Sequence, residues 1–481
     1  MVLIALVDDF LNKITMYRLL LYVLIILMAA AGGFSFFNLL PFAPLSLLFS
    51  VSILLVTCWI SNKLLAKLFS APTNLESVYI TALILSLIIT PIQTAAEIQW
   101  LVLAALISQA GKYILALRKQ HLFNPAALAV FLTGLTVQSY AGWWVGNPFM
   151  LVLVVIGGLL VVRKLRRFSL VLTFFGSYLI FILGSTFNFA LLKTMIESPV
   201  FFFAFVMLTE PQTTPPQKKL QIIYGGAVGA LTFFLTPELA LLIGNMFSYL
   251  SCPREKLLLK LVEKKQIAYQ TYEFIFKADR KLNYLAGQYL EWTLPHQNPD
   301  SRGVRRYFTL ASSPTEKFLK IGIKFYPNAA SFKRKLVDLK MGEQMVAGQL
   351  SGEFILPKDV SKKLCFIAGG IGITPFRSMV KYLLEKSEKR DVVLLYSNKT
   401  ETDISYQDIF DSAESLGVKT AYVVTDKVGF IDEPMIKGWV PDFKDRIFYL
   451  SGPHAMVNAF EKILKGMGVS DIKLDFFPGY A

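Results

Sequence analysis

Cys365-Phe-Ile-Ala-Gly-Gly-Ile-Gly-Ile-Thr-Pro375 is the stretch that decides the fold of the C-terminal half. An apolar run meets a glycine-rich turn there. A helix start follows, because Thr374 is a favoured N-cap residue and Pro375 suits a first helical turn. Gly370 and Gly372 allow the backbone to approach a pyrophosphate at a helix N-terminus. A glycine turn alone is weak support, but one placed between a strand and a helix predicts a nucleotide-binding turn.

Strands and helices alternate around this turn. The pattern predicts strand 363–368, helix 374–386, strand 391–396, helix 404–416, strand 418–425, strand 446–450, helix 454–467 and strand 472–476. Such alternation is typical of a doubly wound α/β domain, to which we assign residues 359–481. Ser451-Gly-Pro-His-Ala-Met456 repeats the design of a strand, a turn and a helix that Pro453 opens.

Residues 253–358 show the shorter alternation of a small antiparallel β-barrel domain. Strand-like segments run over 256–263, 271–277, 287–294, 306–311 and 317–325. In the fourth segment Arg306 can pair with a diphosphate, Phe308 can stack on a planar ring, and Thr309 can hydrogen-bond the edge of that ring. Ser331 opens a predicted helix whose N-terminus can hold a phosphate. Residues 348–354 predict a tight turn. Taken alone, the arginine-containing segment is equally compatible with a plain edge strand.

The motifs of this half occur in a recognisable order. Arg306-x-Phe-Thr309, Ser331, Gly369-Gly-Ile-Gly-Ile-Thr-Pro375, Ser451-Gly-Pro-x-x-Met456 and a terminal aromatic segment together resemble the ferredoxin–NADP⁺ reductase family. The resemblance covers about residues 255–481. It implies bound FAD, a nicotinamide nucleotide substrate, and cofactor-binding roles for Arg306, Tyr307, Phe308, Thr309, Lys324, Ser331, Gly370, Gly372, Thr374, Ser397, Lys399, Gly452, Pro453 and Met456.

The same resemblance implies catalytic contacts with the flavin and the nicotinamide. Thr309 and Ser451 are expected there; Ser451 stands where the family often has a cysteine, and its hydroxyl can still orient the nicotinamide. In the terminal segment Phe477 or Tyr480 is expected to cover the flavin, although either could pack in the core or in a frayed tail. Lys399 follows the second α/β strand, where the family reads the ribose 2′ position, so NADPH is favoured over NADH.

The N-terminal half has a different composition. Residues 1–252 hold only 14 of the 49 Lys and Arg residues and 7 of the 34 Asp and Glu residues. Apolar runs cover 16–39, 42–60, 76–92, 95–117, 123–140, 147–162, 168–187, 196–209, 220–235 and 237–251. A helix needs about 20 apolar residues to cross a bilayer. We therefore predict a polytopic α-helical membrane bundle of about ten spans, give or take one or two, fused to the two soluble domains.

The basic residues of residues 1–252 predict an orientation. Thirteen of them fall on one side of the predicted spans and only Lys193 falls on the other, so that side is assigned to the cytoplasm. Both termini are then cytoplasmic in a multi-pass protein of the cell (inner) membrane. Asp8 and Asp9 favour a short interfacial helix over a cleaved signal peptide. The net charge of +15 does not indicate nucleic-acid binding, because an attraction of the basic residues to anionic lipid head groups explains it.

Two polar segments interrupt the apolar pattern on the inner side, at 118–126 and 208–219. Taken alone, these segments favour ordinary cytoplasmic turns over a cavity in a bundle. Phe123-Asn-Pro-Ala126, Thr209-Glu-Pro-Gln-Thr-Thr214 and Leu220-Gln-Ile-Ile-Tyr-Gly-Gly226 resemble the family of the Rnf complex D subunit and the B subunit of the sodium-translocating NADH:quinone reductase.

This second resemblance implies a flavin in the bundle, either FMN or riboflavin. The residues that correspond to its motifs are Asn124, Thr209, Thr213 and Thr214. Glu210 stands where the family has an aspartate. The family esterifies FMN to a threonine in an outer loop, but residues 138–147 lack a matching threonine, so a non-covalent flavin is expected.

Metal carriers are limited by residue counts. An all-cysteine iron–sulfur cluster needs four thiolates, and the chain has three cysteines. Two haems on four histidines cannot be built from His121, the one histidine of residues 1–252. We therefore expect no haem, no iron–sulfur cluster and no other metal, which leaves flavins as the electron carriers.

Together the two halves predict a membrane-bound NAD(P)H-dependent flavoprotein oxidoreductase. Electrons are expected to pass from NAD(P)H through FAD to a flavin in the bundle, and on to a quinone or a trans-membrane acceptor. The alternative is a membrane-anchored NAD(P)H–flavin reductase that serves a soluble acceptor, with the bundle as an anchor or transporter.

Overall fold

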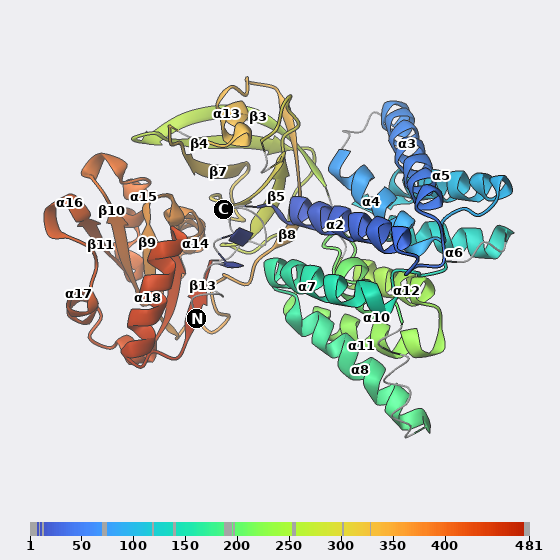
Figure 1. The fold of residues 1–481 in the computed structure, drawn as a ribbon. Helices are drawn as coiled ribbons and strands as arrows, with labels where there is room; N and C mark the ends of the chain where they lie inside the picture. The colour runs from blue at the N-terminus through green and yellow to red at the C-terminus, as the bar shows by residue number, and fades with distance from the viewer. Residues whose placement is uncertain are drawn as a thin grey trace. The chain divides into compact units, whose positions relative to one another are not determined.

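The computed structural model describes residues 7–8, 10–11, 14–69, 75–117, 120–137, 141–186, 195, 198–252, 256–300, 303–327 and 329–475. The described residues form two compact units that divide the chain between Lys256 and Leu257 (Figure 1). We call them the helical unit and the sheet unit. The interfacial helix expected over the first 15 residues lies largely outside the described residues.

Helices build the first unit. They are α2 (Met16–Phe36), α3 (Pro44–Leu68), α4 (Leu75–Ile88), α5 (Ile98–Ile114), α6 (Pro125–Val137), α7 (Pro148–Leu165), α8 (Phe168–Thr186), α10 (Val200–Phe202), α11 (Lys218–Phe234) and α12 (Pro237–Ser251). Two antiparallel strands of two residues each, β1 (Ala116–Leu117) and β2 (Gln120–His121), lie between α5 and α6. Each of the ten predicted apolar runs contains helical residues. The run 196–209 forms only α10 and a π-helical turn, η2 (Phe203–Met207).

Three described helices are long and apolar enough to cross a membrane, namely α2, α3 and α7. Helices α4 and α6 are apolar but shorter, as is Phe168–Gly184, the part of α8 whose side chains the structure describes. With 14 residues, α4 spans about 21 Å against a hydrocarbon core of about 30 Å. It ends at Ile88 because Pro91 follows closely, and a proline disfavours the helical conformation of the residue before it, here Thr90. On length and composition the described helices therefore supply three of the roughly ten expected spans.

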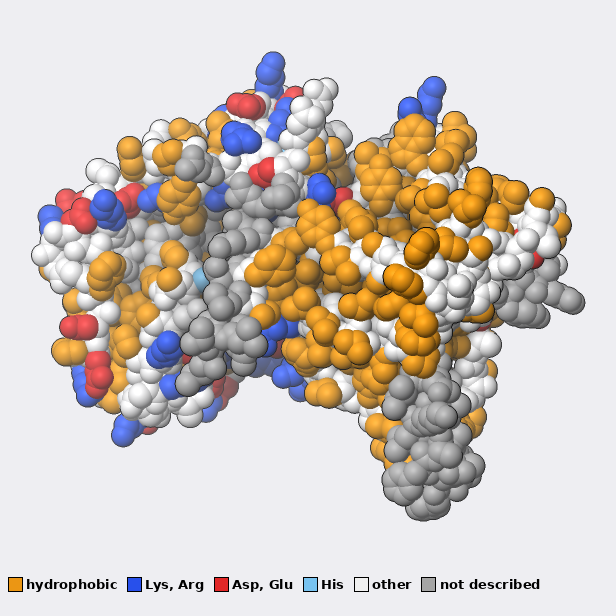
Figure 2. Space-filling view, viewed as in Figure 1, with side chains coloured by type: hydrophobic (Ala, Val, Ile, Leu, Met, Phe, Trp, Pro, Cys, Tyr) orange, Lys and Arg blue, Asp and Glu red, His pale blue; other side chains and the backbone are white. Residues whose placement is uncertain are grey.

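The surface of the helical unit is strongly apolar. Hydrophobic side chains gather into a nearly continuous area over this unit in Figure 2, whereas charged side chains are scattered over the sheet unit. Leu48 and Leu64 on α3 and Ile180 on α8 are each more than 60% exposed. A water-facing surface rarely carries so large an apolar area, which marks an interaction with a membrane or a partner.

Small residues bring α8 and α11 together. A Cβ added at Gly225 would collide with the carbonyl oxygen of Leu170, and one added at Gly229 would collide with that of Phe174. The spacing Gly225-x-x-x-Gly229 allows the two backbones this close approach, as in helix pairs of membrane proteins.

Two sheets build the second unit. The antiparallel sheet has the order β6-β5-β8-β3-β4-β7, and the parallel sheet the order β11-β10-β9-β12-β13. Their strands are β3 (Leu257–Ala268), β4 (Thr271–Ala278), β5 (Tyr289–Thr293), β6 (Arg305–Thr309), β7 (Leu319–Lys324), β8 (Gln344–Ser351), β9 (Lys363–Gly369), β10 (Val392–Asn398), β11 (Val418–Val424), β12 (Arg446–Ser451) and β13 (Ile472–Leu474).

The antiparallel sheet curls toward a barrel. Its two edge strands, β6 and β7, approach each other: the Ala311 amide, just after β6, donates to the Lys320 carbonyl of β7 at 2.8 Å. Helix α13 (Ser331–Val337) packs Phe332 and Leu336 into the core of this sheet. The predicted turn at 348–354 is wrong in its first half: residues up to Ser351 continue β8, and the chain turns at Gly352, where φ is +116°.

The parallel sheet carries helices on both faces, as the sequence predicts. Separate apolar clusters cover its two faces, one with Phe376 of α14 (Thr374–Lys386) and one with Phe460 of α18 (His454–Gly466). The predicted helix 404–416 is instead a short α15 (Gln407–Ser412) flanked by 3₁₀ turns, because Tyr406 before it adopts φ +59°. The pattern also missed α17 (Glu433–Trp439), which the Asp432 side chain caps.

Candidate functional site

The carboxyl ends of three parallel strands meet at one edge of the parallel sheet. Ser397 of β10 lies beside Gly369 of β9, and Ser451 of β12 lies beside Ala368. Ligands of open α/β sheets bind at this edge. The structure therefore brings together the predicted nucleotide residues of β9, β10 and β12.

The glycine turn after β9 is shaped for a close ligand. Gly370 adopts φ +52°, and a Cβ added there would meet nothing within 4 Å. A Cβ at Gly372 would lie 2.6 Å from the Ser451 carbonyl oxygen and 2.7 Å from Gly452. A Cβ at Gly369 would collide with Met456, and Pro453 lies 3.2 Å from the same point. The two turns thus pack closely behind the open space at Gly370.

Helix α14 begins at this turn. Its N-cap residue is Ile373, so Thr374 is the first helical residue and not the cap that the sequence suggested. The Thr374 hydroxyl donates to the Ile371 carbonyl at 3.2 Å, while Pro375 stands in the first turn as expected. The Thr374 amide donates to the Ile371 carbonyl and Pro375 has no N–H, so the first two residues of α14 offer a ligand no free backbone donor.

A buried ion pair ties α14 to the antiparallel sheet. Arg377 pairs with Glu316 and donates to the Ala311 carbonyl at 2.9 Å. Burial would raise the pKa of Glu316, but hydrogen bonds and the charge of Arg377 and a hydrogen bond from Lys320 lower it to about 2. Gly322 of β7 completes the contact, because a Cβ there would lie 2.9 Å from Thr374. These contacts fix the antiparallel sheet against the nucleotide turn.

Arg306 and Phe308 share one face of β6. The Arg306 guanidinium lies 5.4 Å from the centre of the Phe332 ring, and Phe308 packs against the same ring at 5.9 Å. Tyr307 points to the other face, where its hydroxyl donates to Glu291 at 2.8 Å. Thr309 is buried at the end of the strand, beside Tyr289.

The start of α13 already holds an anion. The Ser331 amide donates to the Asp300 carboxylate at 2.9 Å, and the Asp300 amide donates to the Ser331 hydroxyl at 3.0 Å. Arg306 lies 3.8 Å from the same carboxylate, and His296 hydrogen-bonds the Ser331 hydroxyl at 3.0 Å. An arginine, a backbone amide and a hydroxyl that converge on a carboxylate form a donor set that also suits a phosphate. The residues present therefore fit the diphosphate of FAD.

Asp475 is a site residue that the sequence analysis did not select. It directly follows β13, and its Oδ2 accepts a hydrogen bond from the Ser451 hydroxyl at 2.9 Å. Burial raises the pKa of Asp475 to about 7, although the Ser451 hydrogen bond lowers it. An acid at a strand end, just before the aromatic tail, was the available signal. Phe477 and Tyr480, the predicted flavin-covering residues, lie outside the described residues.

Lys324 and Lys399 have different surroundings. Lys324 pairs with Asp403 at 2.6 Å, which links β7 to the 3₁₀ turn η4 (Glu401–Asp403) after β10. Lys399 is exposed in the preceding turn, and Ser397 is partly buried at the end of β10. Lys399 is therefore accessible to a nucleotide phosphate, whereas Lys324 serves an ion pair.

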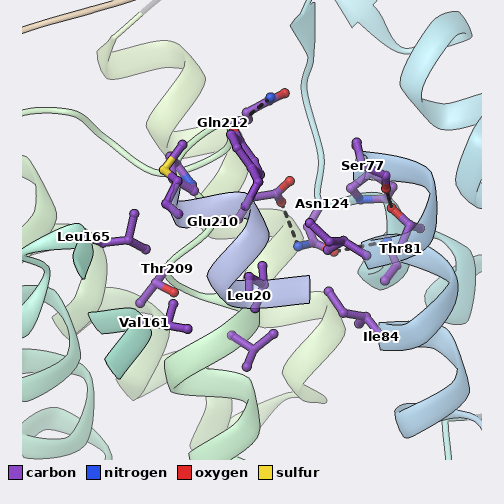
Figure 3. Close-up of a pocket in the computed structure, with 17 residues that line it drawn as sticks. Leu20, Ser77, Thr81, Ile84, Asn124, Val161, Leu165, Thr209, Glu210 and Gln212 are labelled. Atoms are coloured by element: carbon purple, nitrogen blue, oxygen red, sulfur yellow. Dashed lines mark hydrogen bonds between the residues drawn. The ribbon is translucent and has the colours of Figure 1, made fainter. Parts of the chain in front are cut away.

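The helical unit holds a cavity of about 660 Å³, including the part open to solvent. The described residues that line it are Met16, Tyr17, Leu20, Ser77, Ile80, Thr81, Ile84, Asn124, Pro125, Ala126, Val161, Leu165, Val206, Thr209, Glu210, Pro211 and Gln212 (Figure 3). We call it the main cavity.

Glu210 organises the polar side of the main cavity. Its Oε2 accepts hydrogen bonds from the Asn124 side-chain amide at 2.8 Å and from the Thr213 hydroxyl at 3.2 Å (Figure 3 shows the first). The Thr209 hydroxyl donates to the Phe205 carbonyl and the Thr214 hydroxyl to the Glu210 carbonyl. Of the four predicted residues, Asn124 and Thr209 line the main cavity, and Thr213 reaches it through Glu210.

The lining of the main cavity suits a neutral ligand. None of its 17 described lining residues is Lys or Arg, and Glu210 contributes a carboxylate. Arg18 and Lys112, next to this wall, are engaged by Glu76 at 2.6 Å and by the Ser77 carbonyl at 3.1 Å. The phosphate of FMN therefore does not fit these residues, while a ring without a phosphate does.

Known proteins resemble the nucleotide-binding part of the chain. Residues 366–462 match the oxidoreductase NAD-binding domain. The match runs from β9 to α18 and includes Gly370, Gly372 and Ser451. It confirms the expected oxidoreductase nucleotide-binding domain.

Several curated relatives are similar over part of their length. The flavohemoprotein of Oceanobacillus iheyensis is 27% identical over 242 residues, which cover 46% of this chain and 58% of that protein. Flavohemoprotein A of Dictyostelium discoideum is 26% identical over 40% of this chain and 53% of that protein. The chain thus spans about half the length of these relatives. NADH-cytochrome b5 reductase 1 of Emericella nidulans is 26% identical over 43% of this chain and 73% of that protein.

Among solved structures, the cytochrome P450 reductase GcoB of Amycolatopsis is 25% identical, with a TM-score of 0.42. The alignment covers 47% of this chain and 70% of that chain.

Proposed function

We propose that this protein is a membrane-bound flavoprotein oxidoreductase that uses NAD(P)H to reduce a quinone. The observation that carries the proposal is the open glycine turn at Gly370, set at the carboxyl edge of the parallel sheet and fixed against a second sheet with a phosphate-type donor set. The oxidoreductase match over residues 366–462 and the named oxidoreductases among the relatives support it.

FAD, when bound, would accept a hydride and pass on electrons one at a time. In this proposal Arg306 and the Ser331 amide hold its diphosphate, and Phe308 lies against its ring system. Gly370 and Gly372 bring the backbone close to the nicotinamide nucleotide. Ser451, oriented by its hydrogen bond to Asp475, holds the nicotinamide in place. Lys399 reads the 2′ position of the ribose, so NADPH is the preferred donor.

The helical unit is proposed to lie in the cell membrane with both termini in the cytoplasm. The three long apolar helices and the exposed apolar side chains of α3 and α8 support this assignment. Of the ligands expected in the bundle, riboflavin and a quinone head group suit the main cavity, and FMN does not. We assign the quinone to it, because its wall combines apolar side chains with groups such as Glu210 that can hydrogen-bond a ring carbonyl.

The test uses the purified full-length chain in lipid nanodiscs. We expect about one FAD per chain after acid release, bleaching of the flavin absorbance by NADPH under anaerobic conditions, and NADPH-dependent reduction of decylubiquinone. Arg306→Ala should lose FAD, and Lys399→Ala should raise the KM for NADPH about tenfold and leave that for NADH unchanged, as expected for one lost phosphate contact. A chain that retains no flavin would refute the proposal.

The alternative function is a membrane-anchored reductase for a soluble acceptor. The presence of only three long apolar helices among the described ones favours it, because an anchor needs fewer spans than a carrier. Dye reduction without any reduction of decylubiquinone would support this alternative.

A further inference from the structure

Two cavities of the helical unit are neighbours, since Gln212 lines both of them. The main cavity is lined by Glu210, and a second cavity of about 240 Å³, including the part open to solvent, is lined by His121. His121 Nε2 lies 3.6 Å from Glu210 Oε1. Beside the shared Gln212, this pair therefore places one titratable side chain of each cavity within reach of the other.

The hydrogen bonds leave one carboxylate oxygen of Glu210 directed toward His121. Asn124 and Thr213 both donate to Oε2, which fixes the side chain. Asn245 fixes the loop in turn, since its side chain accepts from the Asn124 backbone amide at 2.8 Å and donates to the Tyr224 hydroxyl at 3.1 Å. An imidazole within 4 Å of a carboxylate can exchange a proton with it after a small rotation or through one water molecule.

The two cavities differ in polarity. Apolar residues such as Leu20, Ile80 and Val161 make up much of the main cavity wall. The second cavity is lined by polar groups of Thr213, Ser248 and other residues, which can hold water. The side chains of Glu210 and His121 are only 24% and 9% exposed, and ionisable groups partly withdrawn from water at the ends of apolar helices usually serve a function.

We propose that Glu210 donates a proton to a carbonyl oxygen of the ring reduced in the main cavity, and that His121 returns a proton to Glu210 from water in the second cavity. The inference rests on the proposed function, since that function supplies the electrons. The balance is NAD(P)H + H⁺ + quinone → NAD(P)⁺ + quinol. Each ring oxygen gains one proton, and the two electrons come from the nicotinamide nucleotide. Glu210 is the catalytic residue, and His121 acts through it.

Other charged groups act on the same pair. Lys112 of α5 and Lys256 both influence His121 electrostatically. Burial lowers the pKa of His121 most, Glu210 opposes this, and the two lysines add to the effect of burial, which favours the neutral imidazole that can accept a proton and pass it on. A merely structural role would instead make the pair a fixed bridge between β2 and the turn after η2, with no effect on proton transfer.

The test compares variants of the full chain in nanodiscs by the rate of decylubiquinone reduction divided by that of ferricyanide reduction in the same sample. Glu210→Gln should lower this ratio at least about 100-fold, as loss of a general acid does. Glu210→Asp should recover part of it. His121→Gln should lower kcat more than it raises the KM for decylubiquinone, and both Gln variants should show a larger solvent deuterium isotope effect.

Glu238→Gln is the matched control. Glu238 is a buried glutamate of the same unit, but its carboxylate accepts a hydrogen bond from the Trp143 ring N–H at 3.3 Å, and it is absent from both linings. Its ratio should equal that of the wild type. The inference is overturned if Glu210→Gln keeps the wild-type ratio and isotope effect while wild type reduces both acceptors.

Two other results would also overturn the inference. If the wild-type chain reduces ferricyanide but not decylubiquinone, a quinone is not the acceptor, and the quinone part of the proposed function is wrong as well. A second flavin, released by acid in addition to FAD and lost in Asn124→Ala, would assign the main cavity to a flavin.

Discussion

Gly372 allows the nucleotide turn to pack closely because it has no side chain. Its Cα lies against the turn after β12, where a Cβ would approach the Ser451 carbonyl oxygen to 2.6 Å. Gly372→Ala should push the two turns apart and raise the KM for NAD(P)H at least about tenfold, because a displacement of the backbone weakens ligand contacts. Steady-state ferricyanide assays measure this. Gly438→Ala, where a Cβ meets nothing within 4 Å, is the control and should behave as wild type.

Asp475 makes the stability of the sheet unit depend on pH. Its pKa in the folded chain is raised from 3.8 to about 7, so the folded state keeps a proton that the unfolded state has lost. This contribution to stability is fully present below about pH 4 and is lost as pH rises to about 7, a fall of at most about 4 kcal/mol. Asp475→Asn should remove this fall. Melting curves followed by FAD fluorescence between pH 4 and pH 8 test it; equal slopes in both proteins would contradict the assignment.

At the scale of secondary-structure elements, the ion pair between Arg377 of α14 and Glu316 joins the two sheets. Breaking a buried pair from one side destabilises a protein by about 3–5 kcal/mol, so Arg377→Met should lower the melting temperature of the sheet unit. The exposed pair of Lys437 with Glu433 gives a control, since Lys437→Met should change the free energy of unfolding by less than about 1 kcal/mol.

The same pair predicts sensitivity to acid. The pKa of Glu316 is lowered from 4.5 to about 2 in the folded chain, so its stabilising effect is present above about pH 4.5 and is lost as pH falls toward 2. Wild type should therefore lose stability over this window, and Arg377→Met should lose less. Denaturant titrations at pH 5 and at pH 3 measure the difference.

The pairing of α8 with α11 depends on one face of α11. Gly225→Val would force a side chain into the Leu170 carbonyl and should destabilise the helical unit by about 1–3 kcal/mol. Gly226→Val is the matched control, because a Cβ at the neighbouring Gly226 meets nothing within 4 Å. Thermal stability in detergent distinguishes them, and equal melting temperatures would show that the close approach is unimportant.

At the scale of the whole molecule, the exposed apolar side chains of the helical unit predict insertion into a bilayer. The full chain should stay in the membrane pellet after extraction with alkaline carbonate, since the burial of apolar side chains in lipid does not depend on pH. Release of the chain into the supernatant would instead mean that a protein partner covers these side chains.

Much of the architecture follows from the sequence alone. The change from continuous apolar runs to alternating strands separates the two units, because apolar helices and half-buried strands have different periods. The nucleotide turn and the start of helix α14 were predicted from Gly370, Gly372 and Pro375. Glycine frees the backbone locally, and proline restricts it. Arg306 and Phe308 share a face, as the alternation of a strand requires.

Only the tertiary structure decided the remaining features. Asp475 meets Ser451 because β13 pairs with β12, and Glu210 meets His121 because two distant turns pack together. The predicted helix 404–416 begins late, at Gln407, because the Tyr406 backbone adopts a left-handed conformation that a pattern of apolar residues does not show. Local periodicity determined which elements form. Contacts between residues far apart in the chain decided which acids share a site, which lysines pair with acids, and how many helices are long enough to span a membrane.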